Sequence, residues 1–162
     1  MIVTCHGDAG GQVSRIDPAG NVNTFATIPP GHEIEGPAVV PDGFGSEGGK
    51  IWAGDETGNL IITISNTGVV NTNFASWPGA ESVHVIPPNP CSFGTSDGAL
   101  FSANFANNSI TKFTTGDLSG HGGDVLVVSE NSASTLLIAF DGTTYTGAYF
   151  ENPPPLNKRL AC

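Results

Sequence analysis

A five-residue phrase recurs along this chain and constrains its fold more than any other feature. It passes from large apolar residues through small ones to a polar side chain. Its copies begin at Ile2, Ile51, Leu100 and Leu126, so the spacings are 49, 49 and 26 residues. Turn residues and a second strand-like run follow each copy. A repeat of this kind, built from short strands, predicts the blades of a β-propeller.

The composition favours an all-β chain. Gly (22) and Pro (12) are abundant among the 162 residues, and charged residues make up only 12%. Most of the polar surface must therefore be Asn, Ser and Thr, which favour turns and strands. No long stretch shows the apolar periodicity of a helix.

The strand pattern predicts a single propeller-like domain over 1–152 and a Pro-rich tail over 153–162. We expect about three and a half four-stranded blades, in pieces at 1–30, 33–76, 80–115 and 117–151. A closed propeller usually needs four to eight blades, so we expect half of a six-bladed ring, completed by a second chain as a homodimer. A small sandwich or a parallel β-solenoid is the structural alternative, and whether the chain is a fragment stays open.

The charge balance limits the partners. The net charge is −10, and the chain has only five Lys and Arg residues, of which Lys158 and Arg159 lie in the tail. Nucleic acid needs a basic surface, so we expect none as a partner, and we expect no membrane partner because no apolar span exists. The partners that we expect are therefore a second copy of the chain and a small-molecule or carbohydrate ligand. The Lys-poor composition is typical of secreted or periplasmic proteins, although no signal peptide is present.

Three cysteines, Cys5, Cys91 and Cys162, have no spacing typical of a zinc site. A disulfide between Cys91 and Cys162 and three unrelated thiols are both open.

The polar residue that closes each copy of the phrase is a candidate ligand. These residues are His6, Asp55, Asn104 and Glu130. Corresponding strand ends converge around the axis of a propeller, and oxygen-rich sites favour calcium. We therefore expect a divalent-metal site, calcium above all, on the axis, with His84 and His121 as further axial candidates. The alternative is that each polar residue caps the hairpin that follows it.

Two short motifs resemble those of the gluconolactonase/senescence-marker (regucalcin-like) six-bladed propeller family. Glu35-Gly36-Pro37 precedes an apolar strand, and Asp97-Gly98 precedes the strand that ends at Asn104, where the family has Asp. The match covers roughly 33–115, and similar phrases occur in NHL-type propellers. The resemblance implies that Glu35 and Asn104, with Asp55, hold a divalent ion. In that family the ion polarises a lactone carbonyl and a carboxylate activates water, which would make Asp55 or Glu130 the catalytic base.

Two functions of different class follow. The first is a non-catalytic propeller-type binding or assembly module with a divalent-metal site on its axis. The second is a metal-dependent hydrolase of lactones or related sugar-acid esters.

Overall fold

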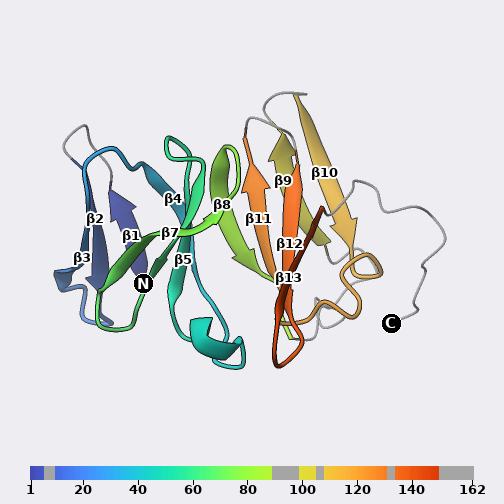
Figure 1. Ribbon diagram of the computed structural model, residues 1–162, viewed down its shortest axis with the longest axis horizontal. Helices are drawn as coiled ribbons and strands as arrows, with labels where there is room; N and C mark the ends of the chain where they lie inside the picture. Colours follow the sequence, from blue (N-terminus) through green and yellow to red (C-terminus); the bar gives the residue numbers. More distant parts are fainter. Residues whose placement is uncertain (6–9, 89–98, 105–107, 131–133, 150–162) are drawn as a thin grey trace.

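The computed structural model describes residues 1–5, 10–88, 99–104, 108–130 and 134–149. Its elements are thirteen β-strands and one short 3-10 turn, η1 (Gly45–Glu47), and the strands form separate antiparallel sheets that stand side by side (Figure 1). The all-β prediction is confirmed. In the described ranges no helix is long and apolar enough to cross a membrane.

The first sheet is a three-stranded meander. Its order is β1 (Ile2–Cys5), β2 (Gly11–Ile16) and β3 (Val22–Ile28). The turn between β2 and β3 forms because Asp17 Oδ1 accepts hydrogen bonds from the backbone N–H groups of Ala19 and Asn21, both at 2.9 Å.

The second sheet is a complete four-stranded blade. It contains β4 (Ile34–Val39), β5 (Ile51–Asp55), β6 (Leu60–Ile64) and β7 (Val70–Ser76) in that order. The central strands β5 and β6 are buried almost throughout, as expected for a blade that has a neighbour on both faces. This sheet coincides with the predicted unit 33–76.

The third sheet combines strands that are not all consecutive in the sequence. β8 (Ala80–Val85) pairs with β11 (Val125–Ser129), and β12 (Thr135–Phe140) and β13 (Tyr145–Tyr149) complete the blade. β9 (Ala99–Asn104) and β10 (Ser109–Thr114) form a separate two-stranded hairpin between them in sequence. The strands are therefore not grouped as in the predicted pieces 80–115 and 117–151. Because the hairpin is an insertion into one blade, the last copy of the phrase follows after only 26 residues.

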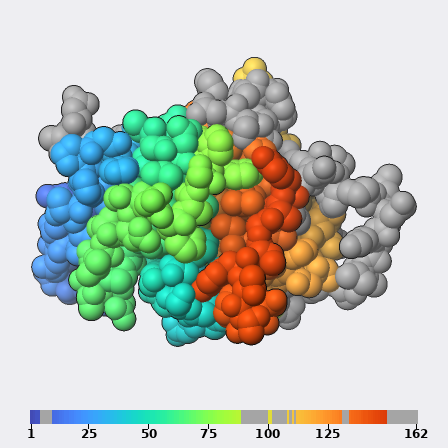
Figure 2. Space-filling view, viewed as in Figure 1, coloured from blue at the N-terminus to red at the C-terminus, as the bar shows by residue number. Residues whose placement is uncertain are grey.

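Apolar side chains fill the space between consecutive sheets. Trp52, Ile61 and Val127 belong to the cluster between the second and third sheets, and Val13 and Ile62 to the one between the first and second. The segment around η1 also lies against the turn between β12 and β13, as Figure 2 shows near its lower edge. There the Tyr145 hydroxyl donates a hydrogen bond to the Phe44 carbonyl at 2.8 Å. Face-to-face packing of successive antiparallel sheets makes the chain a propeller-like array.

The second and third blades meet closely where their first strands begin. A Cβ on Gly36 would overlap Ser82, and a Cβ on Gly54 would overlap the Ala80 carbonyl. Gly36 also has a φ of +46°, in the region that favours glycine. These contacts place the start of β4 against the start of β8, where the candidate site lies.

Candidate functional site

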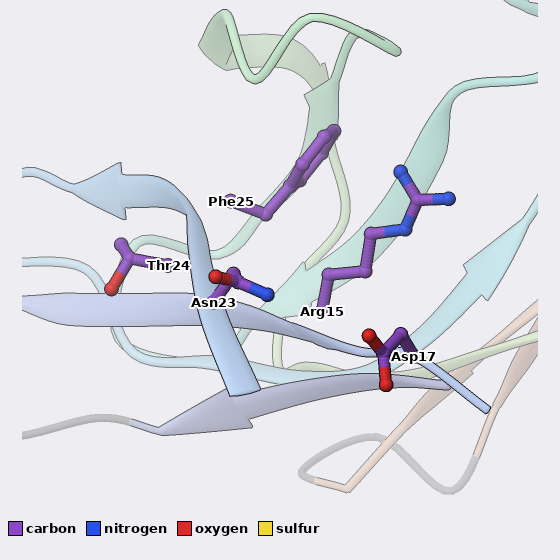
Figure 3. A pocket seen from close by; sticks show the side chains of 5 residues that line it. All are labelled: Arg15, Asp17, Asn23, Thr24 and Phe25. Carbon is purple, nitrogen blue, oxygen red and sulfur yellow. The ribbon is translucent and has the colours of Figure 1, made fainter. Parts of the chain in front are cut away.

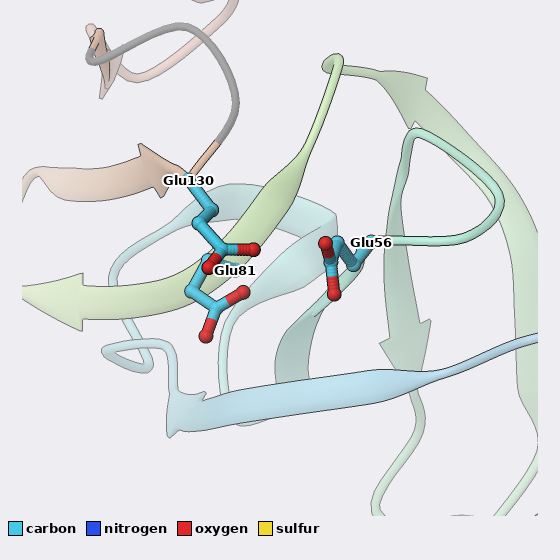
Figure 4. A group of neighbouring side chains, drawn as sticks. All are labelled: Glu56, Glu81 and Glu130. Carbon is cyan, nitrogen blue, oxygen red and sulfur yellow. The ribbon is translucent and has the colours of Figure 1, made fainter. Parts of the chain in front are cut away.

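Four glutamates converge at the junction of the second and third blades. Glu35 and Glu81 are the second residues of β4 and β8, and Glu56 and Glu130 directly follow β5 and β11. Carboxylate oxygens of Glu56, Glu81 and Glu130 lie within 4.8 Å of one another, and Figure 4 shows these three side chains turned toward one space. Glu81 and Glu35 lie within hydrogen-bonding reach of each other. We call Glu35, Glu56, Glu81 and Glu130 the glutamate cluster.

Backbone hydrogen bonds show that the two blades contribute equivalent residues. The Glu56 N–H donates to the Glu33 carbonyl at 3.2 Å, and the Glu130 N–H donates to the Gly79 carbonyl at 3.0 Å. Residues 33 and 79 each immediately precede the first strand of their blade. Glu56 therefore corresponds to Glu130, and Glu35 corresponds to Glu81.

The cluster concentrates negative charge. The pKa of Glu81 is raised to about 7 by partial burial, by its hydrogen bond with Glu35 and by the charges of the neighbouring glutamates. The pKa of Glu56 is also raised, first by its hydrogen bond with Glu130 and then by burial and the surrounding carboxylates. In the described part of the chain, Glu56, Glu81 and Glu130 form no ion pair with Lys, Arg or His. A proton or a bound cation would relieve this repulsion.

The donor set suits a hard divalent cation. The groups that meet here are carboxylates, and calcium prefers oxygen ligands in flexible arrangements. No Cys or His belongs to the group of three oxygens, so zinc and copper are poorer matches. The residues therefore fit the kind of ion that the sequence predicted, although most of the ligands are different ones.

Asp55 has a structural place outside the cluster. Its side chain is fully buried, and Oδ2 lies 2.6 Å from His32 Nδ1. Oδ1 accepts the N–H groups of Glu33 (3.0 Å) and Gly58 (3.1 Å). These contacts tie the entry to β4 to the turn after β5. Both carboxylate oxygens of Asp55 are therefore engaged by neighbouring parts of the fold.

The sequence alignment differs from the structure by one residue here. The repeated phrase matches Asp55 with Glu130, but Glu56 is the structural equivalent of Glu130. Asp55 corresponds instead to Ser129, which is also buried and whose hydroxyl donates to the Pro78 carbonyl at 2.7 Å. Asp55 and Glu130 therefore occupy different positions in their blades, and they do not form the expected ring of equivalent strand ends.

The structure describes some of the other predicted residues through their elements and hydrogen bonds. Asn104 ends β9 in the inserted hairpin. His84 lies on β8 with Nε2 3.1 Å from Ser82 Oγ, and burial lowers its pKa. His121 Nδ1 lies 3.0 Å from Asp124 Oδ2 in the segment before β11. His6, Cys91 and Cys162 lie outside the described residues, as does the side chain of Cys5.

Among the predicted site residues whose side chains the structure describes, it brings Glu35 and Glu130 together. Sequence reasoning missed Glu56 and Glu81. A signal for both exists, because Ile34-Glu35 and Ala80-Glu81 open equivalent strands and Asp55-Glu56 and Ser129-Glu130 close equivalent strands. Matching the two blades by their first strands would have found it.

Comparisons with known proteins give similarity of structure at low sequence identity. No family model matches the sequence, and the search of curated proteins gave no match. Among solved structures, the chain is similar to virginiamycin B lyase from Staphylococcus aureus in its selenomethionine form (TM-score 0.41) and to a catalytically inactive variant with quinupristin (TM-score 0.40). Each match has 17% identity and covers 93% of this chain. The chain spans about half (52%) of the length of those proteins. With TM-scores this low, the propeller-like description rests on the chain's own sheet topology.

Proposed function

We propose that this chain is a propeller-type binding module that holds a divalent cation, calcium, in the glutamate cluster. The observation that carries the proposal is the approach of Glu56, Glu81 and Glu130 oxygens to within 4.8 Å across two blades. Calcium takes six to eight oxygen ligands, so carboxylates alone leave positions for water or for oxygens of a ligand. A small polyhydroxylated or carboxylated molecule is the kind of ligand that could complete such a site.

We also propose that a second copy of the chain completes the ring. The first sheet has three strands where the second and third have four. The inserted hairpin exposes Phe101 (61%) and Ile110 (73%). Phe101 pairs with Lys112 and Ile110 with Ala103, so the two apolar residues are diagonal neighbours on one face of the β9–β10 ladder. Exposed apolar side chains of this size favour association.

The test of the cation site is calorimetric titration of calcium into the metal-free protein. We expect saturable binding by the wild type and a loss of at least about tenfold in affinity for Glu81→Gln and for Glu130→Gln, because each removes a charged ligand. Asp141→Asn is the matched control, since it removes one exposed carboxylate at the β12–β13 turn. Absence of calcium binding by the wild type would reject the proposal.

The second candidate function is metal-dependent hydrolysis of lactones or related sugar-acid esters. The closeness of three carboxylates favours it, because some of them could hold the ion while another accepts a proton from water. Turnover of δ-gluconolactone in the presence of calcium, measured for the wild type and Glu81→Gln, separates the two functions. Calcium binding without turnover supports the non-catalytic module, and turnover by the wild type supports the hydrolase, with Glu81→Gln expected to lose turnover together with calcium affinity.

A further inference from the structure

A cleft of about 370 Å³ opens on the first sheet, and no residue of the glutamate cluster lines it. It is lined by Arg15, Asp17, Asn23, Thr24 and Phe25, and we call it the Arg15 cleft (Figure 3). Its volume lies near the lower end of the range of roughly 300–1,000 Å³ that is usual for small-molecule sites.

Arg15 presents an unengaged guanidinium to this cleft. Within the described residues its side chain makes no hydrogen bond and no ion pair, although the chain has 15 Asp and Glu residues. The other described cations are engaged, because Lys50 pairs with Glu47 at 2.8 Å and Lys112 lies 6.0 Å from the centre of the Phe101 ring. A planar guanidinium with five donors matches the two oxygens of a carboxylate.

A β-bulge brings an aromatic wall to the same side of the sheet. Arg15 pairs with Asn23, and the register shift between Val13 and Ser14 leaves Phe25 as the extra residue of β3. In Figure 3 the Phe25 ring and the Arg15 guanidinium stand on either side of an open space, with Asn23 between their bases. Phe25 is held in place, since it packs on the cluster between the first and second sheets.

Asp17 closes the cleft without neutralising Arg15. Its oxygens already accept hydrogen bonds from the backbone of Ala19 and Asn21 and from Asn21 Nδ2 (2.8 Å). These bonds lower the pKa of Asp17, so it stays ionised and committed to the turn. No ion pair joins Asp17 to Arg15 in the described structure.

We propose that the Arg15 cleft binds a small organic acid, with its carboxylate on the Arg15 guanidinium and an apolar or aromatic body against Phe25. The Asn23 amide offers a further hydrogen bond to the same carboxylate. This site differs from the glutamate cluster because it lies on the first sheet, centres on a cation and would bind an anion. Because Arg15 is exposed, the contact is only partly desolvated, and the expected dissociation constant is on the order of millimolar.

The test is a titration of the isotope-labelled protein with phenylacetate, followed by NMR chemical shifts. We expect saturable shifts at Arg15, Asn23 and Phe25, and an affinity at least about tenfold weaker for Arg15→Gln. Arg15→Lys should have an affinity for phenylacetate between those of the wild type and Arg15→Gln, because an ammonium keeps the charge but lacks the paired N–H donors of the guanidinium. Lys112→Gln removes a cation elsewhere and should bind like the wild type.

Three probes identify the chemistry that is recognised. Phenylacetamide has the same body without the charge and should bind more weakly than phenylacetate. Acetate and inorganic phosphate lack the body and should also bind more weakly. Absence of saturation with phenylacetate, unchanged binding by Arg15→Gln, or equal binding of phenylacetamide or phosphate would each overturn the proposal.

Discussion

At the scale of single residues, the site depends on which carboxylates lie close to other carboxylates and which already have hydrogen-bond partners. Glu81 has other glutamates as neighbours, and its pKa rises to about 7. Asp55 is more deeply buried, but it has His32 and two backbone N–H groups as partners. The same chemical group is therefore crowded by like charges in one place and serves as a structural hydrogen-bond acceptor in the other.

The pH dependence of stability should reveal the Glu81 proton. In the folded chain Glu81 holds a proton up to about pH 7, whereas its ordinary pKa is 4.5, so the free energy of unfolding should fall as the pH rises from about 4.5 to 7. Solvent screening limits the effect to about 1 kcal/mol, or ~2–4 °C in Tm. Thermal unfolding at pH 5 and pH 8 in EDTA measures it, and Glu81→Gln should reduce the difference. A Tm that rises over this interval, or an unchanged difference in the variant, would contradict the prediction.

Replacement of Asp55 should weaken the fold. Asp55→Asn converts one acceptor oxygen to a donor next to His32, and we expect the free energy of unfolding to fall by about 2 kcal/mol in urea denaturation. The matched control is Asp124→Asn, which alters the more exposed pair with His121. An equal loss in both variants would show that burial of Asp55 has no special role.

At the scale of elements, glycine allows the blades to approach closely enough to bring the glutamates together. Gly54 lies in β5 against the backbone of Ala80 at the start of β8. Backbone atoms cannot move aside as the end of a side chain can. The distance between Glu56 and Glu81 thus depends on a residue that carries no functional group.

The substitution Gly54→Ala should separate the second and third blades. We expect a loss of about 2–3 kcal/mol in the free energy of unfolding, because the new methyl group would overlap the Ala80 carbonyl. Gly43→Ala is the control, since a Cβ there meets nothing within 4 Å, and it should change stability by less than about 0.5 kcal/mol. Equal stability of the two variants would mean that the close contact is not maintained in solution.

At the scale of the whole molecule, the array is open. One three-stranded sheet, two four-stranded blades and a hairpin do not form a closed ring of blades in the described structure. If a second copy completes the ring, sedimentation velocity should give twice the chain mass of 16.6 kDa. Phe101→Ser should shift the mass toward that of a single chain, because it reduces an exposed apolar surface. A single-chain mass for the wild type at all concentrations would exclude the dimer.

The sequence by itself determined the all-β class and the positions of many strands. Strand-like apolar runs and turn residues act between near neighbours, so they predicted the blade from β4 to β7. Glu35 was predicted from the resemblance to the gluconolactonase-type propellers, which rests on a short continuous motif.

Only the tertiary structure decided which strands share a blade and which glutamates share a site. β8 pairs with β11 across an inserted hairpin, and no local pattern encodes a pairing at that separation. A shift of one residue moves a side chain to the opposite face of a strand, and this shift separates buried Asp55 from clustered Glu56. The repeated phrase therefore located strands, while tertiary pairing defined the blades and strand register defined the cluster at their junction.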